Sequence, residues 1–378
     1  MTDAPLPEAD RLPGVPHPRE APALIGHAAA EAAFLDAHAT GRLHHAWLIT
    51  GPRGTGKATL AWRIARFLLA EPPEDDGGLF GDTPPAPASL DIDPEHPIAR
   101  RVAALSEPRL MLLRPQWDEK AKRLRSEITV EDTRKLNAFF GLSAADGGRR
   151  VVIVDAADQM NVNAANALLK LLEEPPARAT LLLVCHRPAR LLPTIRSRCR
   201  ELRLTELAPG DIARVLDQTG IATDAPPEIL AELAGGAPGT AIQLTTEDGP
   251  ALYARLLTLF ADAPLMDRPA AIKLAEDAAQ RGREARRDLI LRLIDLYLAR
   301  LARTGAGAPP NAEAAPGEAA HLARLSPDPR AARQWAALQQ TLADRAQHGL
   351  AVNLDPSSLI LDMVLKINET AAAITARH

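Results

Sequence analysis

One stretch of the sequence has glycine and lysine residues at a spacing that could bind phosphate. Gly51, Gly54, Gly56 and Lys57 lie within GPRGTGKA and fit the pattern G-x-x-x-x-G-K. Glycines let backbone N–H groups close around phosphate oxygens, and the first turn of a following helix adds partial positive charge. The lysine would reach the outer phosphates. The pattern therefore predicts a phosphate cradle between a strand and a helix.

The residues that follow this pattern are poorly suited to metal-assisted hydrolysis. The position where a Ser or Thr hydroxyl would bind Mg²⁺ is Ala58, and a methyl group cannot bind a metal ion. Thr59 comes next, but one residue along a helix is a rotation of about 100°, so its hydroxyl should point elsewhere. We include both positions in a degenerate nucleotide site and predict no metal site.

A second candidate is the acid at the end of an apolar run. Val151 to Val154 form a continuous apolar segment that ends in Asp155, as in a Walker B strand, where the carboxylate would hold Mg²⁺. In hydrolysing proteins of this class a glutamate follows and activates water. Here Ala156 and Ala157 follow, so the general base is missing. Asp155 is therefore either part of the nucleotide site or a simple cap of the strand end.

The third candidate is an arginine in the segment PTIRSRCR, residues 193–200. A guanidinium group is always charged and offers planar donors that suit a terminal phosphate. Arg198, placed after the last strand of a nucleotide-binding sheet, could reach the site of a neighbouring subunit. On composition alone the three arginines of this segment fit a solvated charged turn better than a functional site.

Composition excludes several classes of protein. The chain has 378 residues with 44 basic and 48 acidic side chains, so it is not a strongly basic polyanion binder. Aromatic residues make up only 3%, which argues against base-stacking platforms. With two cysteines, Cys185 and Cys199, a four-cysteine zinc site is impossible, and we predict no zinc. No apolar run is long enough to span a membrane, so we expect a cytoplasmic protein.

Strands and helices are expected to alternate up to about residue 204, which predicts a parallel α/β sheet. Apolar runs predict buried strands, and apolar residues at helical spacing predict helices between them. The strands are expected at residues 46–50, 109–114, 151–154 and 180–184, and the helices at 57–70, from 129 and at 161–174. From Pro209 onward helical patterns dominate.

These patterns divide the chain into four predicted parts. Residues 1–20 are expected to be a disordered lead, and residues 21–207 a P-loop domain in which residues 71–97, rich in Pro, Gly and Asp, form a flexible insertion. Residues 208–248 are expected to be a small helical lid. Residues 249–378 are expected to be an all-α domain used for oligomerisation.

Several segments together resemble the AAA+ family and, within it, the clamp-loader subunits of bacterial replication. The resemblance covers about residues 20–245 well and the remainder loosely. The matching segments are HAWLITGP (45–52), GK (56–57), VDAAD (154–158), NALLKLLEEP (166–175), LPTIRSRC (192–199), GGAPG (235–239) and NLDP (353–356).

The resemblance implies an α/β AAA+ P-loop domain, a small helical lid and an all-α collar that joins subunits. It further implies a largely non-hydrolysing subunit that helps to load a sliding clamp on primed DNA with gamma/tau and delta partner subunits. Arg198 would be a finger donated in trans to ATP on the adjacent gamma-type subunit. ATP or ADP could be held at the chain's own site without efficient hydrolysis. Cys185 and Gly239 occupy positions where a hydroxyl and an arginine sensor are expected.

Two other interpretations remain open at this point. The chain could be a catalytically active AAA+ ATPase, similar to the gamma/tau subunit, that holds Mg²⁺ through water and Asp155 alone. It could also be an independent DNA-binding regulator, for which the charged stretches 120–125 and 281–287 are the only support.

Overall fold

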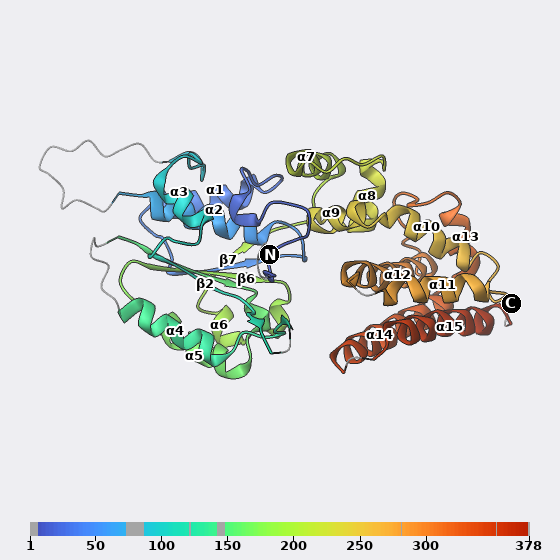
Figure 1. Ribbon diagram of the computed structural model, residues 1–378. Coiled ribbons are helices and arrows are strands. Elements are labelled where there is room, and N and C mark those ends of the chain that lie inside the picture. Colours follow the sequence, from blue (N-terminus) through green and yellow to red (C-terminus); the bar gives the residue numbers. More distant parts are fainter. Residues whose placement is uncertain are drawn as a thin grey trace, which may run out of the picture. The chain divides into compact units, whose positions relative to one another are not determined.

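The computed structural model describes residues 7–72, 87–120, 122–141, 148–280, 282–352 and 354–376. By its contacts the chain divides into two compact units, Met1–Leu207 and Ala208–His378 (Figure 1). The predicted fold class is confirmed: the first unit is built around a parallel sheet, and the second is helical.

A five-stranded parallel sheet of order β2-β5-β6-β1-β7 forms the centre of the first unit. The three inner strands are apolar and buried, as expected for a sheet covered on both faces. The strands are β1 (Ala46–Thr50), β2 (Leu110–Leu113), β5 (Arg150–Asp155), β6 (Ala179–Cys185) and β7 (Arg200–Arg203), while β3 (Trp117–Asp118) and β4 (Arg123–Leu124) form a separate antiparallel pair.

Helices cover both faces of this sheet, with α1, α2 and α3 on one side and α4, α5 and α6 on the other (Figure 1). Alternating side chains of the inner strands enter the two cores, so that Trp47 and Ile49 pack under α2 while Ala46 and Leu48 face α5. The helices of this unit are α1 (Ala28–Ala39), α2 (Lys57–Ala70), α3 (Pro97–Ala103), α4 (Val130–Gly141), α5 (Val162–Glu173) and α6 (Pro193–Arg196), with short 3₁₀ turns at Pro18–Glu20, Ala157–Gln159 and Pro188–Arg190.

The predicted lead and insertion differ from the structure. Residues 1–6 lie outside the described residues, but residues 7–20 fold onto the first unit instead of forming a disordered lead, because His17 is fully buried and Arg19 is almost so. Within the predicted insertion, residues 73–86 lie outside the described residues. Leu90 is buried, and Asp91 pairs with Arg63 at 2.8 Å, so this part is held in place.

The second unit contains helices α7 to α15 within the described residues. Both the predicted lid, residues 208–248, and the predicted collar, residues 249–378, fall within this unit. The helices are α7 (Pro209–Thr219), α8 (Pro227–Ala234), α9 (Pro238–Thr246), α10 (Gly249–Leu259), α11 (Arg268–Ala279), α12 (Glu284–Gly305), α13 (Glu318–Leu325), α14 (Pro329–Ala351) and α15 (Pro356–Thr375).

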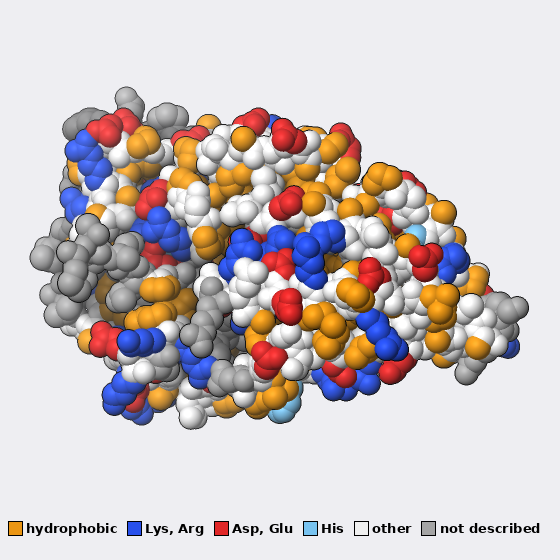
Figure 2. Space-filling view, turned by 45° about the vertical axis from the view of Figure 1, so that its right-hand side comes forward, with side chains coloured by type: hydrophobic (Ala, Val, Ile, Leu, Met, Phe, Trp, Pro, Cys, Tyr) orange, Lys and Arg blue, Asp and Glu red, His pale blue; other side chains and the backbone are white. Residues whose placement is uncertain are grey.

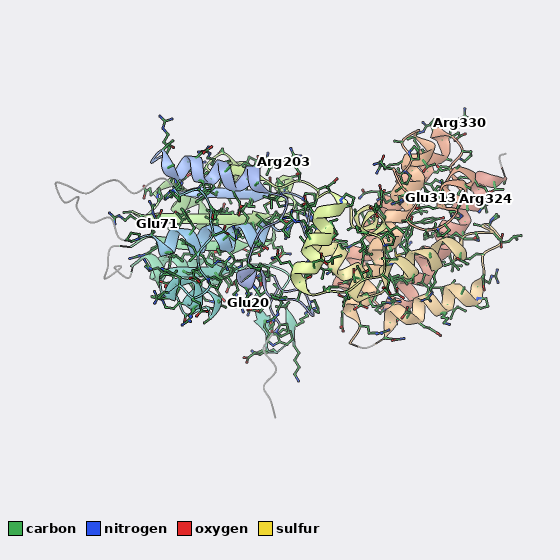
Figure 3. All side chains as sticks on the ribbon, turned by 90° about the horizontal axis from the view of Figure 1, so that it is seen from above. Glu20, Glu71, Arg203, Glu313, Arg324 and Arg330 are labelled. Carbon is green, nitrogen blue, oxygen red and sulfur yellow. The ribbon has the colours of Figure 1, made fainter. Side chains whose placement is uncertain are left out.

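A buried ionic cluster joins the helices of the second unit. The guanidinium of Arg300 on α12 lies 2.8 Å from the carboxylate of Glu318 on α13 and 3.3 Å from that of Glu232 on α8. Tyr253 on α10 donates its hydroxyl to Glu318 at 2.5 Å. On α13, Arg324, labelled in Figure 3, donates to backbone carbonyls at residues 260, 261 and 263. Polar contacts therefore link the predicted lid to the predicted collar.

The surface carries charges of both signs. On the face shown in Figure 2, Lys and Arg side chains are interspersed with Asp and Glu. Among the helices of the described residues, none combines the length and the apolar character needed to cross a membrane.

The ionic cluster makes a test of stability possible. Replacing Glu318 with Gln removes a charge that is 1% exposed and leaves the Arg300 guanidinium without its closest carboxylate. Unpaired buried charges cost several kcal/mol, so we expect Glu318→Gln to lower the free energy of unfolding of this unit by about 3 kcal/mol. Urea unfolding, followed by hydrogen exchange in α12 and α13, would measure it.

The matched control is Glu369→Gln, because Glu369 lies exposed on α15. It should change the same free energy by less than about 0.5 kcal/mol. Equal effects of the two substitutions would show that the buried cluster contributes nothing special to stability.

Candidate functional site

The loop between β1 and α2 can only be built from glycine at two of its positions. Gly51 has a φ of +143°, and a Cβ added there would lie 2.4 Å from the backbone oxygen of Leu204. Gly56, at the start of α2, has a φ of +93°, and its Cβ would lie 2.9 Å from a methyl group of Leu24. The loop therefore keeps the tight backbone path that a phosphate cradle requires.

Side chains from the loop and from the preceding helix hold the cradle in shape. The hydroxyl of Thr55 donates to the carbonyl oxygen of Pro52 at 2.9 Å. His27, the residue before α1, donates from Nε2 to the carbonyl oxygen of Thr55 at 2.8 Å and is itself buried. The pattern of glycines did not point to His27, which lies 28 residues earlier in the chain.

Lys57 is turned toward the loop in which it lies. Its Nζ donates to the carbonyl oxygens of Gly51 at 2.8 Å and of Pro52 at 2.5 Å, and the residue is only 2% exposed. Burial lowers the pKa of Lys57 to about 8, while the nearby carboxylates of Asp155 and Asp158 act in the opposite direction. The ammonium group thus lies at the cradle, where an incoming phosphate would compete with two carbonyl oxygens for it.

Asp155 ends β5 beside the cradle. Burial raises the pKa of Asp155 to about 7, and Asp10 acts in the same direction, whereas Lys57, Arg114 and Arg53 oppose it. A carboxyl group with this pKa is about half protonated at neutral pH. The protonated fraction would have to lose its proton before the carboxylate could bind Mg²⁺, since metal binding needs the ionised form.

Ala58 and Ala156 stand where a hydroxyl for Mg²⁺ and a general base for water are expected. Ala58 packs its methyl group against the core beneath α2, and Ala156 is buried with 2% exposure. Cys185 ends β6 and is buried, which raises the pKa of its thiol to about 12. The residues present therefore fit the phosphate groups of a nucleotide but not a Mg²⁺ ion with an activated water.

Other polar groups near the carboxyl end of the strands form hydrogen bonds within the protein. Thr50, the last residue of β1, donates its hydroxyl to Glu201 on β7 at 2.5 Å. Asp158 accepts from the backbone N–H of His186 at 2.8 Å. Within the described residues, no group of three or more His, Cys, Asp or Glu side chains is arranged to hold a metal ion.

Arg198 lies at the amino-terminal end of the parallel strands, whereas the cradle lies at their carboxyl end. Because β7 runs parallel to β1, Arg200 is level with Trp47 near the start of β1, and Arg203, labelled in Figure 3, is level with Thr50 at its end. Arg198 precedes Arg200, and each strand residue advances about 3.3 Å. Gly51, Lys57 and Asp155 therefore lie together at the carboxyl end of the strands. Arg198 lies apart from them, at the amino end.

The side chain of Arg198 is partly exposed to solvent on the surface of the first unit. It is 37% exposed, and its two terminal nitrogens donate to Glu173 at 2.9 Å and to the carbonyl oxygen of Thr194 at 3.0 Å. Glu173, at the end of α5, is 49% exposed. An ion pair this exposed contributes little stability, so a stronger anion could displace Glu173 from Arg198.

Comparison with known proteins shows that this part of the chain is similar to subunits of DNA polymerase III. Residues 26–208 match the family described as DNA polymerase III, delta subunit. The delta prime subunit of DNA polymerase III from Pseudomonas aeruginosa is 39% identical over 203 residues, which are 53% of this chain and 55% of that protein. The delta prime subunit from Escherichia coli is 34% identical over 216 residues, covering 55% of this chain and 56% of that protein.

The gamma/tau subunit of DNA polymerase III is also similar to this chain. The protein from Mycobacterium tuberculosis is 30% identical over 258 residues, which are 63% of this chain and 40% of that protein. The chain thus spans little more than half the length of the delta prime relatives that it matches, and less of the gamma/tau relative. The recognised similarity is to delta prime subunits.

The raised pKa of Asp155 predicts a pH-dependent cost to folding. The carboxyl group has a pKa of about 7 in the folded chain, against 3.8 for an ordinary aspartic acid, so the folded state holds this proton more tightly. The free energy of unfolding therefore falls as the pH rises from about 4 to about 7, and the loss is complete above 7. Asn at this position cannot ionise and escapes that loss.

We therefore expect Asp155→Asn to stabilise the chain relative to the wild type, by an amount that grows by about 3 kcal/mol between pH 5 and pH 8. Urea midpoints at the two pH values measure this difference. Asp36→Asn, which changes an exposed acid on α1, should show no such growth. A difference that is constant with pH would contradict the assigned environment of Asp155.

Proposed function

This chain resembles the delta prime subunits of DNA polymerase III, and we propose that it serves as a delta prime-type subunit of a clamp loader. In this role it hydrolyses little ATP itself and helps gamma/tau and delta partner subunits to load a sliding clamp on primed DNA. Arg198 is the residue it contributes to catalysis, as a finger placed on ATP held by the adjacent gamma-type subunit.

The position of Arg198 is the observation that carries this proposal. The guanidinium is accessible and lies at the edge of the sheet away from the chain's own cradle, so a phosphate that it touches has to come from another molecule. An arginine at the developing charge of phosphoryl transfer stabilises the transition state. Its weak pair with Glu173 holds the side chain at the surface until such a phosphate is present.

The defects of the chain's own cradle support the division of labour. Phosphate groups fit the loop and Lys57, so ATP or ADP could bind there. Ala58 and Ala156 offer neither a hydroxyl for Mg²⁺ nor a base for water. A bound nucleotide would therefore stay intact and act as a static part of the subunit.

The alternative is an active ATPase similar to the gamma/tau subunit. The intact glycine pattern, the buried Lys57 and the similarity to the Mycobacterium tuberculosis gamma/tau subunit favour it. It requires Mg²⁺ to be held through water and Asp155 alone. The two functions make opposite predictions for Arg198 and Lys57.

The finger is tested by Arg198→Ala in a clamp loader reconstituted with gamma-type and delta subunits. We expect turnover at the one neighbouring ATP site to fall by at least about 100-fold, because the arginine acts mainly in the transition state. Total DNA-stimulated ATP turnover by the complex then falls by the fraction that this one site contributes. Arg196→Ala is the control, since Arg196 is an exposed arginine two residues away. Equal turnover with Arg198→Ala, in complexes of unchanged mass, would refute the finger.

Lys57→Ala separates the two functions. In a delta prime-type subunit, we expect this substitution to leave the turnover of the complex within about twofold of the wild type, since the chain's own site does no chemistry. In an active ATPase, loss of the phosphate-binding lysine would abolish turnover by the isolated chain. Steady-state release of phosphate from the isolated chain and from the complex measures both. Brisk Mg²⁺-dependent turnover by the isolated wild-type chain would favour the ATPase.

A further inference from the structure

A segment near the N-terminus, residues 8–20, is fastened across the first unit, and we call it the strap. Arg19 pairs with Glu8 at 2.8 Å and donates to the carbonyl oxygen of Ala103, the last residue of α3, at 2.9 Å. Arg66 on α2 donates to the carbonyl oxygen of Arg19 at 2.8 Å. The rings of His17 and Trp62 on α2 form a T-shaped pair, with the ring centres 5.9 Å apart and the planes at 83°. Glu20, which ends the strap, is labelled in Figure 3.

Two carboxylates of the strap hold one arginine of the sheet. Arg114, which follows β2, donates from Nη2 to Glu8 at 2.7 Å and from Nη1 to Asp10. The other oxygen of Asp10 lies 3.1 Å from Nε2 of His17. The side chain of Asp10 is 3% exposed, and side-chain pairing lowers the pKa of Glu8 to about 2 even though burial opposes this. Glu8 is therefore ionised at neutral pH.

This pairing takes place at the carboxyl end of the strands, the end that also carries the phosphate cradle. Leu113 is level with Val154 in the register of β2 and β5, so Arg114 leaves the sheet where Asp155 does. The charges of Asp10 and Arg114 both act on Asp155, and Asp155 acts on Lys57. The strap thus brings two acids to Arg114, an arginine that lies next to Asp155 at the end of the strands that carries the cradle.

We propose that the strap is an intramolecular brake on nucleotide binding, in which Glu8 and Asp10 occupy Arg114 and Asp10 adds negative charge near Asp155, at the end of the strands that carries the phosphate cradle. The ligand it opposes is a nucleoside diphosphate or triphosphate, whose charge is repelled by the acids of the strap. The brake depends on the cradle accepting phosphate. It does not depend on Arg198 or on any partner subunit, so its failure would leave the proposed finger untouched.

The test measures binding by the isolated full chain with Asp10→Asn. The probe is ADP carrying an N-methylanthraniloyl fluorophore, titrated without Mg²⁺ so that its charge is not neutralised. In a partly buried site, removing one nearby charge changes the affinity for an anion by about tenfold. We expect the dissociation constant of the probe to fall by about this factor. Mg²⁺ in excess should reduce the gain, because it neutralises the diphosphate.

Two further variants complete the design. Asp36→Asn removes the same charge from an exposed position on α1 and should leave the dissociation constant unchanged. Glu8→Gln releases one side of Arg114 with a substitution of similar size and should also tighten binding. It keeps the test open if Asp10→Asn fails to fold, which circular dichroism and a thermal melt would reveal.

Three results would contradict the proposed brake. Unchanged affinity in both strap variants would overturn the brake, and so would a failure of the folded variants to bind the probe at millimolar concentration. Weaker binding of Asp10→Asn in the presence of Mg²⁺ would instead mean that the carboxylate helps to hold the metal ion, which also contradicts the proposal.

Discussion

The parallel pairing of β1 with β6 and β7 is the constraint on which the rest of the first unit depends. Parallel strands end at a common edge, so the loop after Thr50, the acid Asp155 and the thiol of Cys185 meet there. The same pairing sends Arg198 to the opposite edge. The parallel pairing thus places the residues of the phosphate cradle together and keeps Arg198 away from them.

Burial decides how the cradle behaves. Lys57 and Asp155 lie in the same low-dielectric region, where burial shifts both groups toward their neutral forms, and their attraction offsets only part of this effect. Such a site is costly to fold unless a ligand or a neighbouring group compensates. In this chain the carbonyl oxygens of Gly51 and Pro52 accept hydrogen bonds from the ammonium of Lys57. Asp155 has Arg114 at the end of the neighbouring strand, and the charges of Arg114 and of Asp10 in the strap both act on it.

Sequence patterns predicted the elements whose residues are uniform in character. The buried strands β1, β5 and β6 are continuous apolar runs, and the glycines of the cradle have a spacing that few other structures need. Helix α1 was not predicted, because alanines on all its sides hide the apolar face. The edge strand β7 was hidden by charged residues around its one buried leucine, Leu202. The strap depends on pairs about 100 residues apart, such as Glu8 with Arg114, for which no local pattern exists.

The separation of donor and cradle across one sheet gives the first unit a polarity. A phosphate held by the cradle lies out of reach of Arg198 of the same chain, because the length of β1 separates the two. The two groups can therefore take part in one reaction only between different molecules, which is the arrangement that the proposed finger requires.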